Sequence, residues 1–394
     1  MNKKQIKMAL LSVCPPISGL RSIIAGYEAG KYTHHLQPKE KVLYSENDIE
    51  KKREFVVAAS KKNKKRARTD SQKIEELLQT VPDFQGLDDA QKEELRTDIL
   101  FCRFAYGFMP DEYVCYNFIS KRSPAERKSF ISESDHMRYC YKMNDPVDIC
   151  IFNDKEQTYQ KFGAYYNREV IAVSKKSDRE KYLDYVKKHP VFVKKQVFES
   201  CGNSIERIDL NTCTKSENTL FESFLSQGKV ILEEVVEQGK ETAVFNESSV
   251  NTIRCITINT KKGICAPYCF MKIGRKGSFV DNGGAGGILV GIDKDTGITN
   301  TGGYDERRRY YEEHPDSGVQ FSGHQLPQWD SLISICKEMA SRMPSVRYIG
   351  WDLAYTKDNK WVVIEGNGMS QFIGPQTIWQ RGIKKEVAAF MKDM

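Results

Sequence analysis

Residues 348–367 read YIGWDLAYTKDNKWVVIEGN, and this stretch constrains the fold more than any other part of the chain. Apolar and polar residues alternate on both sides of a short polar break, which is typical of an antiparallel β-hairpin. A tight turn centred between Asp358 and Asn359 would place Asp352 directly opposite Glu365 on one face. The pattern therefore predicts two carboxylates paired across one strand ladder.

Two carboxylates in that position repel each other, so the pairing is costly unless a positive charge lies between them. Asn367 follows on the same face and adds an amide oxygen to the set. Two carboxylates and an amide oxygen suit Mg²⁺, which completes its shell with water and phosphate. The hairpin is thus a candidate metal site. The alternative is a solvated surface hairpin whose acidic side chains never meet.

At 394 residues the chain exceeds one typical domain, and its composition, 40% hydrophobic and 11% aromatic, is globular. It has no run of about eighteen apolar residues, so we expect no membrane-spanning helix. Residues 1–16 are basic but lack the hydrophobic region of a signal peptide, so none is expected. The eleven cysteines form no CxxC pair, which is typical of reduced thiols. These features predict a cytoplasmic protein.

The net charge of +7 is unevenly distributed, because residues 51–68 hold nine Lys or Arg and one acid, Glu54. One interpretation is a solvated helix face. The other is attraction to an anionic partner, either a membrane surface reached from the cytoplasm or a polyanionic glycan precursor and its biosynthetic proteins. No aromatic interleaving accompanies the run, so nucleic acid is the least expected partner.

The N-terminal region, residues 1–105, has mostly helical periodicity. Asp70 and Asp88 each stand before an apolar repeat, as helix-capping residues do. The helical, polar character continues to residue 144 and includes a further helix start at Ser123-Pro124. This part of the chain is expected to be mostly helical.

From residue 153 the sequence changes to short β-branched runs separated by helices, and from 229 it is mainly strands with glycine-rich connections. A final helix is expected over residues 376–394. This alternation favours the α+β class with a mixed or antiparallel sheet. No G-x-G-x-x-G follows a strand, so a parallel dinucleotide-binding fold is not supported.

A first group of candidate ligand-binding residues lies around residue 200. Lys194 and Lys195 belong to the strand-like run HPVFVKKQVF, and a lysine among buried apolar residues needs an anion such as a nucleotide phosphate. The small residues of the following loop, 200–204, include Cys201 and Gly202. Their backbone amides could cover phosphates.

A second group follows two later strands. Glu233, Glu234 and Glu237 end an apolar strand and could bind an adenine amino group or a ribose, although the edge of a sheet has the same pattern. Arg254 lies inside an alternating strand, and a buried arginine requires a carboxylate or a substrate phosphate as its partner.

Lys272 and Arg275 precede a glycine cluster at residues 283–287. Only glycine lets the backbone approach a ligand this closely or repeat a positive φ. A flexible hairpin loop would explain the glycines but not the two cations just upstream.

These motifs keep the order seen in ATP-grasp enzymes: NDK at 153–155, FVKK at 192–195, ILEEVVEQ, NTIR, the glycine cluster and the D-x₁₂-E-x-N hairpin. Over residues 105–390 the chain resembles the sugar-transfer associated ATP-grasp family most closely, from SVNTIR through VDNGGAGG and HPDSG to IGWD and IEGN. The resemblance implies an ATP-grasp fold, in which two α+β subdomains grip ATP. It implies the following units: a helical, basic region at 1–105, the first part of the core at 106–165, an ATP-lid subdomain at 166–228 and a catalytic subdomain at 229–394.

The resemblance also implies roles for individual residues in binding ATP and two Mg²⁺ ions, for which Mn²⁺ can substitute. The implied sets are metal ligands Asp352, Glu365 and Asn367; phosphate lysines Lys155 and Lys194; lid residues Cys201 and Gly202; adenine contacts Glu233 and the backbone near Val235; a ribose contact, Glu237; and catalytic cations Arg254, Lys272 and Arg275. The chain departs from the family pattern in having lysine where arginine is usual at 272, Lys195 where proline is common, and fewer glycines in the lid.

His314, together with Tyr310 and Tyr311, lies between the glycine cluster and the hairpin. These residues could recognise the carboxylate or the nucleophile, with His314 accepting a proton. The alternative is a histidine with a purely structural place in a loop.

The favoured hypothesis is an ATP- and Mg²⁺-dependent ligase that joins a carboxylate to an amine through an acyl phosphate. By the family resemblance its substrates would be an amino acid and a sugar or glycan precursor, in polysaccharide biosynthesis. Thiol or hydroxyl nucleophiles stay possible. Two alternatives stay open: phosphoryl transfer to a hydroxyl, and a non-catalytic nucleotide-binding partner of a glycosyltransferase complex.

Overall fold

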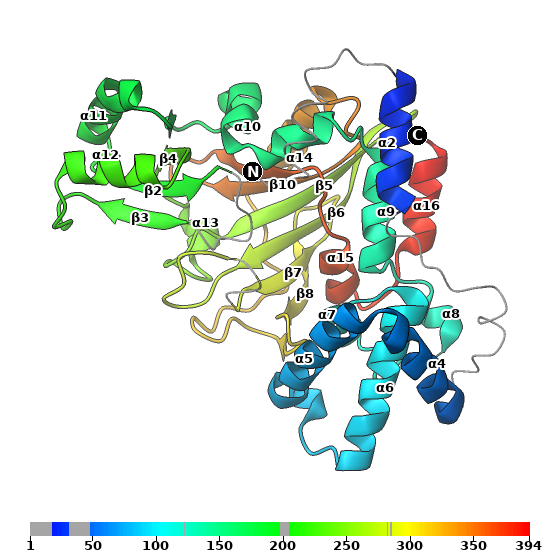
Figure 1. The fold of residues 1–394 in the computed structure, drawn as a ribbon. Helices are drawn as coiled ribbons and strands as arrows, with labels where there is room; N and C mark the ends of the chain where they lie inside the picture. The colour runs from blue at the N-terminus through cyan, green and yellow to red at the C-terminus, as the bar shows by residue number, and fades with distance from the viewer. Residues whose placement is uncertain (1–17, 31–47, 122, 198–204, 282, 284–285) are drawn as a thin grey trace.

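The computed structural model describes residues 18–30, 48–121, 123–197, 205–281, 283 and 286–394 (Figure 1). Among these residues, no helix is both long enough and apolar enough to cross a membrane. Helices surround two antiparallel sheets, one of four strands and one of seven. This arrangement confirms the expected α+β class, with helices in the N-terminal region.

The described residues before 144 form helices joined by turns and short loops. The helices are α2 (Ser18–Gly30), α4 (Ile49–Lys62), α5 (Lys64–Thr80), α6 (Asp89–Tyr106), α7 (Pro110–Cys115), α8 (Pro124–Arg127) and α9 (Glu133–Met143), with a 3-10 turn, η1 (Pro82–Phe84), after α5. Helices α4 to α7 share one buried aromatic cluster that contains Phe55, Phe101 and Tyr113. In the same cluster Phe108 meets Phe118 edge-on, with ring centroids 4.8 Å apart.

A buried ion network stabilises this helical core. Asp98 of α6 accepts hydrogen bonds from Lys52 Nζ at 2.7 Å, Arg127 Nη2 at 2.6 Å and Tyr113 OH at 2.6 Å. Burial alone would raise the pKa of Asp98, but Arg127 and Lys52 hold that pKa well below its ordinary range. Because Lys52, Asp98 and Arg127 are all buried, loss of the Asp98 carboxylate would leave two cations in the core without a counter-charge.

Helix starts follow the capping residues of the sequence with one exception. Asp88 and Gln91 form a capping box at the start of α6, and Ser123 caps α8. Asp70, by contrast, lies inside α5, is buried, and pairs with Arg103 Nε at 2.9 Å. The prediction of a helix start at Asp70 is therefore wrong, because this carboxylate serves a buried ion pair.

The smaller sheet has the strand order β1-β4-β2-β3 and is antiparallel throughout. Its strands are β1 (Val170–Val173), β2 (Val191–Gln196), β3 (Glu206–Asp209) and β4 (Val230–Glu234). Helices α11 (Arg179–Lys188) and α12 (Glu217–Ser226) cover one face, where Phe192 and Leu232 pack with Tyr182 and Phe221. The resemblance put the end of the ATP-lid subdomain at residue 228, but strand β4 of this sheet begins at Val230, beyond that boundary.

The larger sheet has the order β11-β10-β5-β6-β7-β8-β9, also antiparallel. Its strands are β5 (Thr252–Thr260), β6 (Gly263–Ile273), β7 (Ile288–Ile292), β8 (Thr299–Tyr304), β9 (Tyr310–Tyr311), β10 (Tyr348–Tyr355) and β11 (Trp361–Asn367). The remaining helices are α10 (Lys155–Phe162), α13 (Lys240–Ala243), α14 (Trp329–Ser341), α15 (Ile373–Ile378) and α16 (Lys384–Lys392). Three further 3-10 turns are η2 (Asp148–Asn153), η3 (Gly163–Tyr165) and η4 (Lys176–Asp178).

The two faces of the larger sheet differ in what covers them. On one face, Ile253, Cys255 and Leu353 pack with Leu332 and Met339 of α14 in the largest core cluster. Because side chains alternate along a strand, the even-numbered residues of β5 and β10 project from the other face. That second face carries the polar residues discussed below.

The second face is apolar at one end. Ile256, Ile258 and Tyr348 pack there with Ile378 of α15 and Val387 of α16. Arg254 is in phase with Ile256 and Ile258, as the alternation predicted. The face therefore runs from a helix-covered apolar end to a polar end that lies toward the smaller sheet (Figure 1).

The C-terminal segment forms two helices, not the single helix expected over residues 376–394. Helix α15 ends at Ile378, and Gln380 follows with a positive φ of 48°. A residue in the left-handed region ends an α-helix, so the chain breaks before α16 begins. The side-chain amide of Gln380 donates to the carbonyl oxygen of Cys115 at 2.8 Å, which fixes this break against α7.

Candidate nucleotide site

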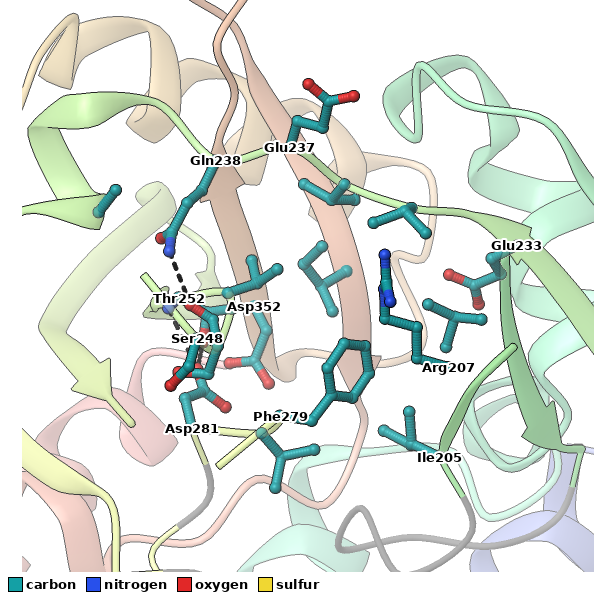
Figure 2. A pocket seen from close by; sticks show the side chains of 18 of the residues that line it. Ile205, Arg207, Glu233, Glu237, Gln238, Ser248, Thr252, Phe279, Asp281 and Asp352 are labelled. Atoms are coloured by element: carbon teal, nitrogen blue, oxygen red, sulfur yellow. Dashed lines mark hydrogen bonds between the residues drawn. The ribbon is translucent and has the colours of Figure 1, made fainter. Parts of the chain in front are cut away.

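A cavity of about 840 Å³ lies between the two sheets. Its walls come from β2, β3 and β4 of the smaller sheet and from β5, β6, β10 and β11 of the larger sheet. Figure 2 shows Arg207 and Phe279 extending toward its middle, with Glu233 on one side and Asp352 and Asp281 on the other. The cavity therefore joins an apolar wall to a cluster of opposite charges, as a site for an anionic ligand with an apolar ring requires.

The predicted acidic pair exists. Asp352 of β10 is the direct cross-strand partner of Glu365 of β11, and both line the cavity. The register shifts beside this pair, because Leu353 pairs with Val363 and leaves Ile364 as an extra residue. This bulge lets two consecutive residues, Ile364 and Glu365, line the cavity.

The hairpin turn differs from the predicted one. Thr356 N donates to Lys360 O at 2.9 Å, which encloses a loop of three residues in which Asn359 has a φ of 58°. A loop of three residues ending in a left-handed residue is a common hairpin connection. It shifts the register by one residue relative to the predicted turn, and the bulge at Ile364 restores the pairing of Asp352 with Glu365.

Two cations face Asp352 from adjacent strands. Arg254 Nε and Nη2 donate to the two Asp352 oxygens at 2.5 and 2.8 Å, and Lys272 Nζ donates to Oδ2 at 3.1 Å. Burial would raise the pKa of Asp352, but Arg254 and Lys272 lower it to about 2. The predicted catalytic cations are therefore brought together with the predicted metal ligand.

The position of Arg254 depends on a glycine. Its Nη1 donates to Ser370 Oγ at 3.0 Å. Gly350 lies beneath this contact, and a Cβ there would stand 2.3 Å from Ser370 Oγ and 3.1 Å from Arg254 Cδ. No other residue at 350 would leave Arg254 and Ser370 in contact.

Asp281 is a site residue that was not predicted. It is buried, lies 3.5 Å from Lys272 Nζ, and accepts hydrogen bonds from Thr252 N at 3.1 Å and Thr252 Oγ1 at 2.5 Å. Burial and the nearby Asp352 raise the pKa of Asp281. The only sequence signal was an aspartate just before the glycine cluster. The sequence analysis considered the two cations upstream of that cluster, Lys272 and Arg275, and not the aspartate.

Glu233 occupies the opposite wall of the cavity. Lys195 Nζ donates to Glu233 Oε2 at 2.9 Å, and Arg168 Nη2 donates to the same oxygen at 2.9 Å. Burial would raise the pKa of Glu233, but Lys195 and Arg168 lower it to about 2. Its carboxylate is thus held by two cations that line the same cavity.

The cavity-facing lysine of β2 is Lys195. Val193 and Lys195 line the cavity, whereas Phe192 packs under the helices on the other face. Lys194 shares the phase of Phe192 and lies 3.5 Å from Glu206. The family resemblance pointed to Lys194, whereas the cavity wall contains Lys195 and not Lys194.

Of the other predicted nucleotide-binding residues, some line the cavity and some do not. Val235 and Glu237 line the cavity just after β4, although Figure 2 shows the Glu237 carboxylate pointing away from it, and Glu237 forms an ion pair with Lys357. Lys155 is the first residue of α10 and does not line the cavity. Cys201 and Gly202 lie outside the described residues.

The remaining catalytic candidates lie outside the cavity. Arg275 pairs with Asp316, with Nε 2.8 Å from Oδ2. His314 is fully buried: its Nε2 contacts Gly274 O at 3.0 Å, and its Nδ1 accepts from Asp316 N and Ser317 N at 3.3 Å. Burial lowers the pKa of His314, so the ring is neutral with its proton on Nε2.

The structure places His314 within its own loop. Both ring nitrogens are engaged by the backbone, which favours the structural alternative for this histidine. Tyr310 is exposed, and Tyr311 OH donates to Asp305 at 3.2 Å.

The basic stretch 51–68 covers parts of α4 and α5. Lys52 is buried against Asp98, whereas six cations from the α4–α5 junction are exposed and make no ion pair within the part of the chain that the structure describes: Lys61, Lys62, Lys64, Lys65, Arg66 and Arg68. Attraction of this surface to an anionic partner stays a prediction.

Comparison with known proteins adds to this geometry. The sequence profile described as sugar-transfer associated ATP-grasp matches residues 134–392. The chain belongs to the sugar-transfer associated ATP-grasp family. The fold is therefore an ATP-grasp fold, with the cavity between its two sheets, and much of the helical N-terminal region precedes the matched segment.

Solved structures are similar to this chain only at low identity. PsnB complexed with a minimal precursor is 12% identical over 64% of this chain and 64% of that chain, with a TM-score of 0.39. D-alanyl-alanine synthetase A from Vibrio cholerae is 10% identical over 63% of this chain and 66% of that chain, with a TM-score of 0.40. N5-carboxyaminoimidazole ribonucleotide synthetase from Thermotoga maritima is 13% identical over 63% of this chain and 51% of that chain, with a TM-score of 0.37. The chain thus spans just under two thirds of PsnB, and curated proteins give no match.

The donor set of this ATP-grasp hairpin fits Mg²⁺. Asp352, Glu365 and Asn367 offer only oxygen as metal ligands, and the described residues contain no cluster of three or more His, Cys, Asp or Glu side chains that could hold another metal. Glu365 makes no hydrogen bond or ion pair with the described residues. Asp352 Oδ2 accepts from both Arg254 and Lys272, whereas Oδ1 accepts from Arg254 alone and keeps a lone pair for a metal.

Proposed function

We propose that the protein is an ATP- and Mg²⁺-dependent ligase that joins a carboxylate to an amine through an acyl phosphate. One observation carries the proposal: the paired carboxylates Asp352 and Glu365 line the cavity together with Lys272, and Arg254 donates to Asp352 beside them. Acids that hold a metal and cations that bind phosphate are both needed for phosphoryl transfer, and here they share one sheet face.

The nucleotide is proposed to lie across the cavity. Its apolar wall, with Val193, Val235 and Phe279, suits the adenine ring, while Lys195 and Arg168 sit beside Glu233 at the smaller sheet. The triphosphate would extend toward Arg254 and Lys272 on the larger sheet. This orientation places the γ-phosphate at the acidic hairpin.

The reaction has two steps. A substrate carboxylate oxygen attacks the γ-phosphorus, ADP leaves, and an acyl phosphate forms; the amine then attacks the acyl carbon, phosphate leaves, and the amine loses a proton. Mg²⁺ held by Asp352, Glu365 and Asn367 would neutralise the triphosphate. Arg254 and Lys272 stabilise the charge that develops on the phosphoryl oxygens, and Ser370 and Gly350 keep Arg254 in place for this.

The substrates proposed are an amino acid and a sugar or glycan precursor. The family description, sugar-transfer associated, supports the sugar half. The amino-acid half follows from the need for a carboxylate that ATP can activate. The cavity chemistry itself supports nucleotide binding and carboxylate activation.

Hydroxylamine trapping tests carboxylate activation directly. The protein is incubated with ATP, Mg²⁺, hydroxylamine and each of the common amino acids, and hydroxamate, ADP and phosphate are measured. The proposal predicts equimolar hydroxamate and ADP for at least one amino acid. Arg254→Leu should lower this rate by about 10²–10³-fold, as loss of a transition-state donor does. Asp358→Asn, in the exposed hairpin turn, is the control.

Two results would overturn the proposal that the protein is a ligase. ADP formed with a phosphorylated hydroxyl and no hydroxamate would indicate a phosphotransferase. Bound ATP without turnover for any amino acid would indicate a nucleotide-binding partner.

A further inference from the structure

Lys272 of β6 lies between two carboxylates at the wall of the nucleotide cavity and is 8% exposed. Its Nζ is 3.1 Å from Asp352 Oδ2 and 3.5 Å from Asp281 Oδ1. An ammonium group has three N–H donors, so two of them can point at these carboxylates while the third is left for a ligand. The two carboxylates together therefore fix the direction in which the third N–H points.

Asp281 is anchored to the strand beside Lys272. Thr252 of β5 is the direct cross-strand partner of Lys272. Thr252 N and Thr252 Oγ1 both donate to Asp281 Oδ2, at 3.1 and 2.5 Å (Figure 2). Because both hydrogen bonds go to one oxygen, they orient the carboxylate and leave Oδ1 to face Lys272.

The chain turns back after β6 and returns Asp281 to Lys272. Gly274 directly follows the strand, and a Cβ there would stand 2.1 Å from Ser249 Oγ and 3.0 Å from Val280 O. Any larger residue at 274 would push away the segment that carries Asp281. The close approach of the two backbone segments thus brings this carboxylate to the cavity wall.

Asp352 has other partners, whereas Asp281 has none of this kind. Arg254 donates to both oxygens of Asp352, at 2.5 and 2.8 Å, and Asp352 is one of the residues proposed to hold Mg²⁺. Within the part of the chain that the structure describes, Lys272 is the one cation in ion-pair contact with Asp281. When Asp352 is shared with Arg254 and a metal ion, Lys272 keeps Asp281 as its own counter-charge.

A carboxylate beside a phosphate site has a cost, because it repels the phosphate oxygens. Asp281 lines the same cavity as Lys272 and is buried, which adds the cost of removing its charge from water. An asparagine would keep an oxygen for Thr252 without either cost. The fold of the loop alone therefore does not explain the charge at 281, whereas its contact with Lys272 does.

We propose that Asp281 is a positioning residue, which holds the ammonium group of Lys272 at the cavity wall so that its third N–H points at a phosphoryl oxygen of the nucleotide. This rests on the proposed ligase function and adds a residue that acts through Lys272, without touching the substrate.

A double-mutant cycle on ATP affinity tests the proposal. Calorimetry on the full chain measures the Kd for ATP with Mg²⁺ in the native protein, Asp281→Asn, Lys272→Met and the double variant. Asp281→Asn keeps an acceptor for Thr252 and removes the charge, and it should weaken binding by about tenfold or more. In the Lys272→Met background the same change should leave the affinity unchanged or make it tighter, because only the repulsion of phosphate is removed.

A carboxylate that merely supports the loop would give the same fold-change in both backgrounds. Asp305→Asn is the control, because Asp305 is a buried aspartate that accepts from two backbone N–H groups outside the cavity. Should Asp281→Asn not fold, Thr252→Val removes one of the two hydrogen bonds that orient Asp281. It should weaken ATP binding by a smaller factor, and again only when Lys272 is present.

Equal fold-changes in the two backgrounds, unchanged or tighter binding in Asp281→Asn alone, or no effect of Lys272→Met would overturn the proposal. The hydroxamate assay separates this result from the ligase function. Hydroxamate formation with ATP binding that depends on Lys272 but not on Asp281 contradicts only the positioning role. An effect of Asp281→Asn that requires Lys272, without hydroxamate from any amino acid, contradicts only carboxylate activation.

Discussion

Asp352 lies opposite Glu365 on one side and opposite Arg254 on the other, so one carboxylate joins the predicted metal ligands to the predicted phosphate-binding cations. The three side chains project from the same face of the larger sheet. This relationship links the protonation of the site to its stability.

Replacement of Asp352 by Asn should lower the free energy of unfolding by about 3–5 kcal/mol, because the partly buried Arg254 would lose its counter-charge and the buried Lys272 would keep only Asp281. Urea unfolding measures the change. The double variant Asp352→Asn/Arg254→Met should lose clearly less unfolding free energy than the two single variants lose together. Simple additivity would mean that the pair does not stabilise the fold as described.

Lys195→Met should weaken binding of ATP with Mg²⁺ by about tenfold or more, since a charged contact in the cavity is removed. Lys194→Met, one residue away on the same strand, should change the affinity less than twofold. Calorimetric measurement of the ATP affinity of both variants decides which lysine binds the nucleotide. A larger effect at Lys194 would support the family-based assignment and contradict the strand alternation.

The stability of the protein should fall in acid. Glu233 and Asp352 have folded-state pKa values of about 2, below their ordinary values, so their stabilising contribution is complete above about pH 4.5. It is lost as the pH falls toward 2, because the unfolded chain binds protons first. Glu233→Gln should therefore reduce the loss of unfolding free energy between pH 6 and pH 3 in urea titrations. If Glu233→Gln loses as much unfolding free energy between pH 6 and pH 3 as the native protein, Glu233 does not contribute to the acid sensitivity.

His314→Ala should destabilise the protein by about 1–3 kcal/mol, because it leaves Gly274 O and two backbone N–H groups without their partner. The rate of hydroxamate formation per folded molecule should stay unchanged. If the rate of hydroxamate formation in this variant no longer depends on pH where the native rate does, His314 transfers a proton.

Much of the site could be predicted from the sequence because period-two alternation fixes which residues share a strand face. The alternation correctly grouped Arg254 with Ile256 and paired Asp352 with Glu365. The pairing was reached through the wrong turn, however. The three-residue loop and the bulge at Ile364 each shift the register by one, and neither has a pattern that marks it in the sequence.

Other features depended on contacts between distant parts of the chain. Asp281 meets Lys272 and Thr252 only once β5 and β6 are paired, so no local pattern identifies it. Lys195 was passed over because motif order put Lys194 in its place, although the phase of the strand favoured Lys195.

Calorimetric titration of ATP with Mg²⁺ into the native protein and into Glu365→Gln tests the central claim most directly, with Asp358→Asn as the control from the same hairpin. We predict Mg²⁺-dependent binding that is lost in Glu365→Gln and retained in the control. Absence of binding by the native chain, or equal binding by Glu365→Gln, would contradict a nucleotide site built on the Asp352–Glu365 pair.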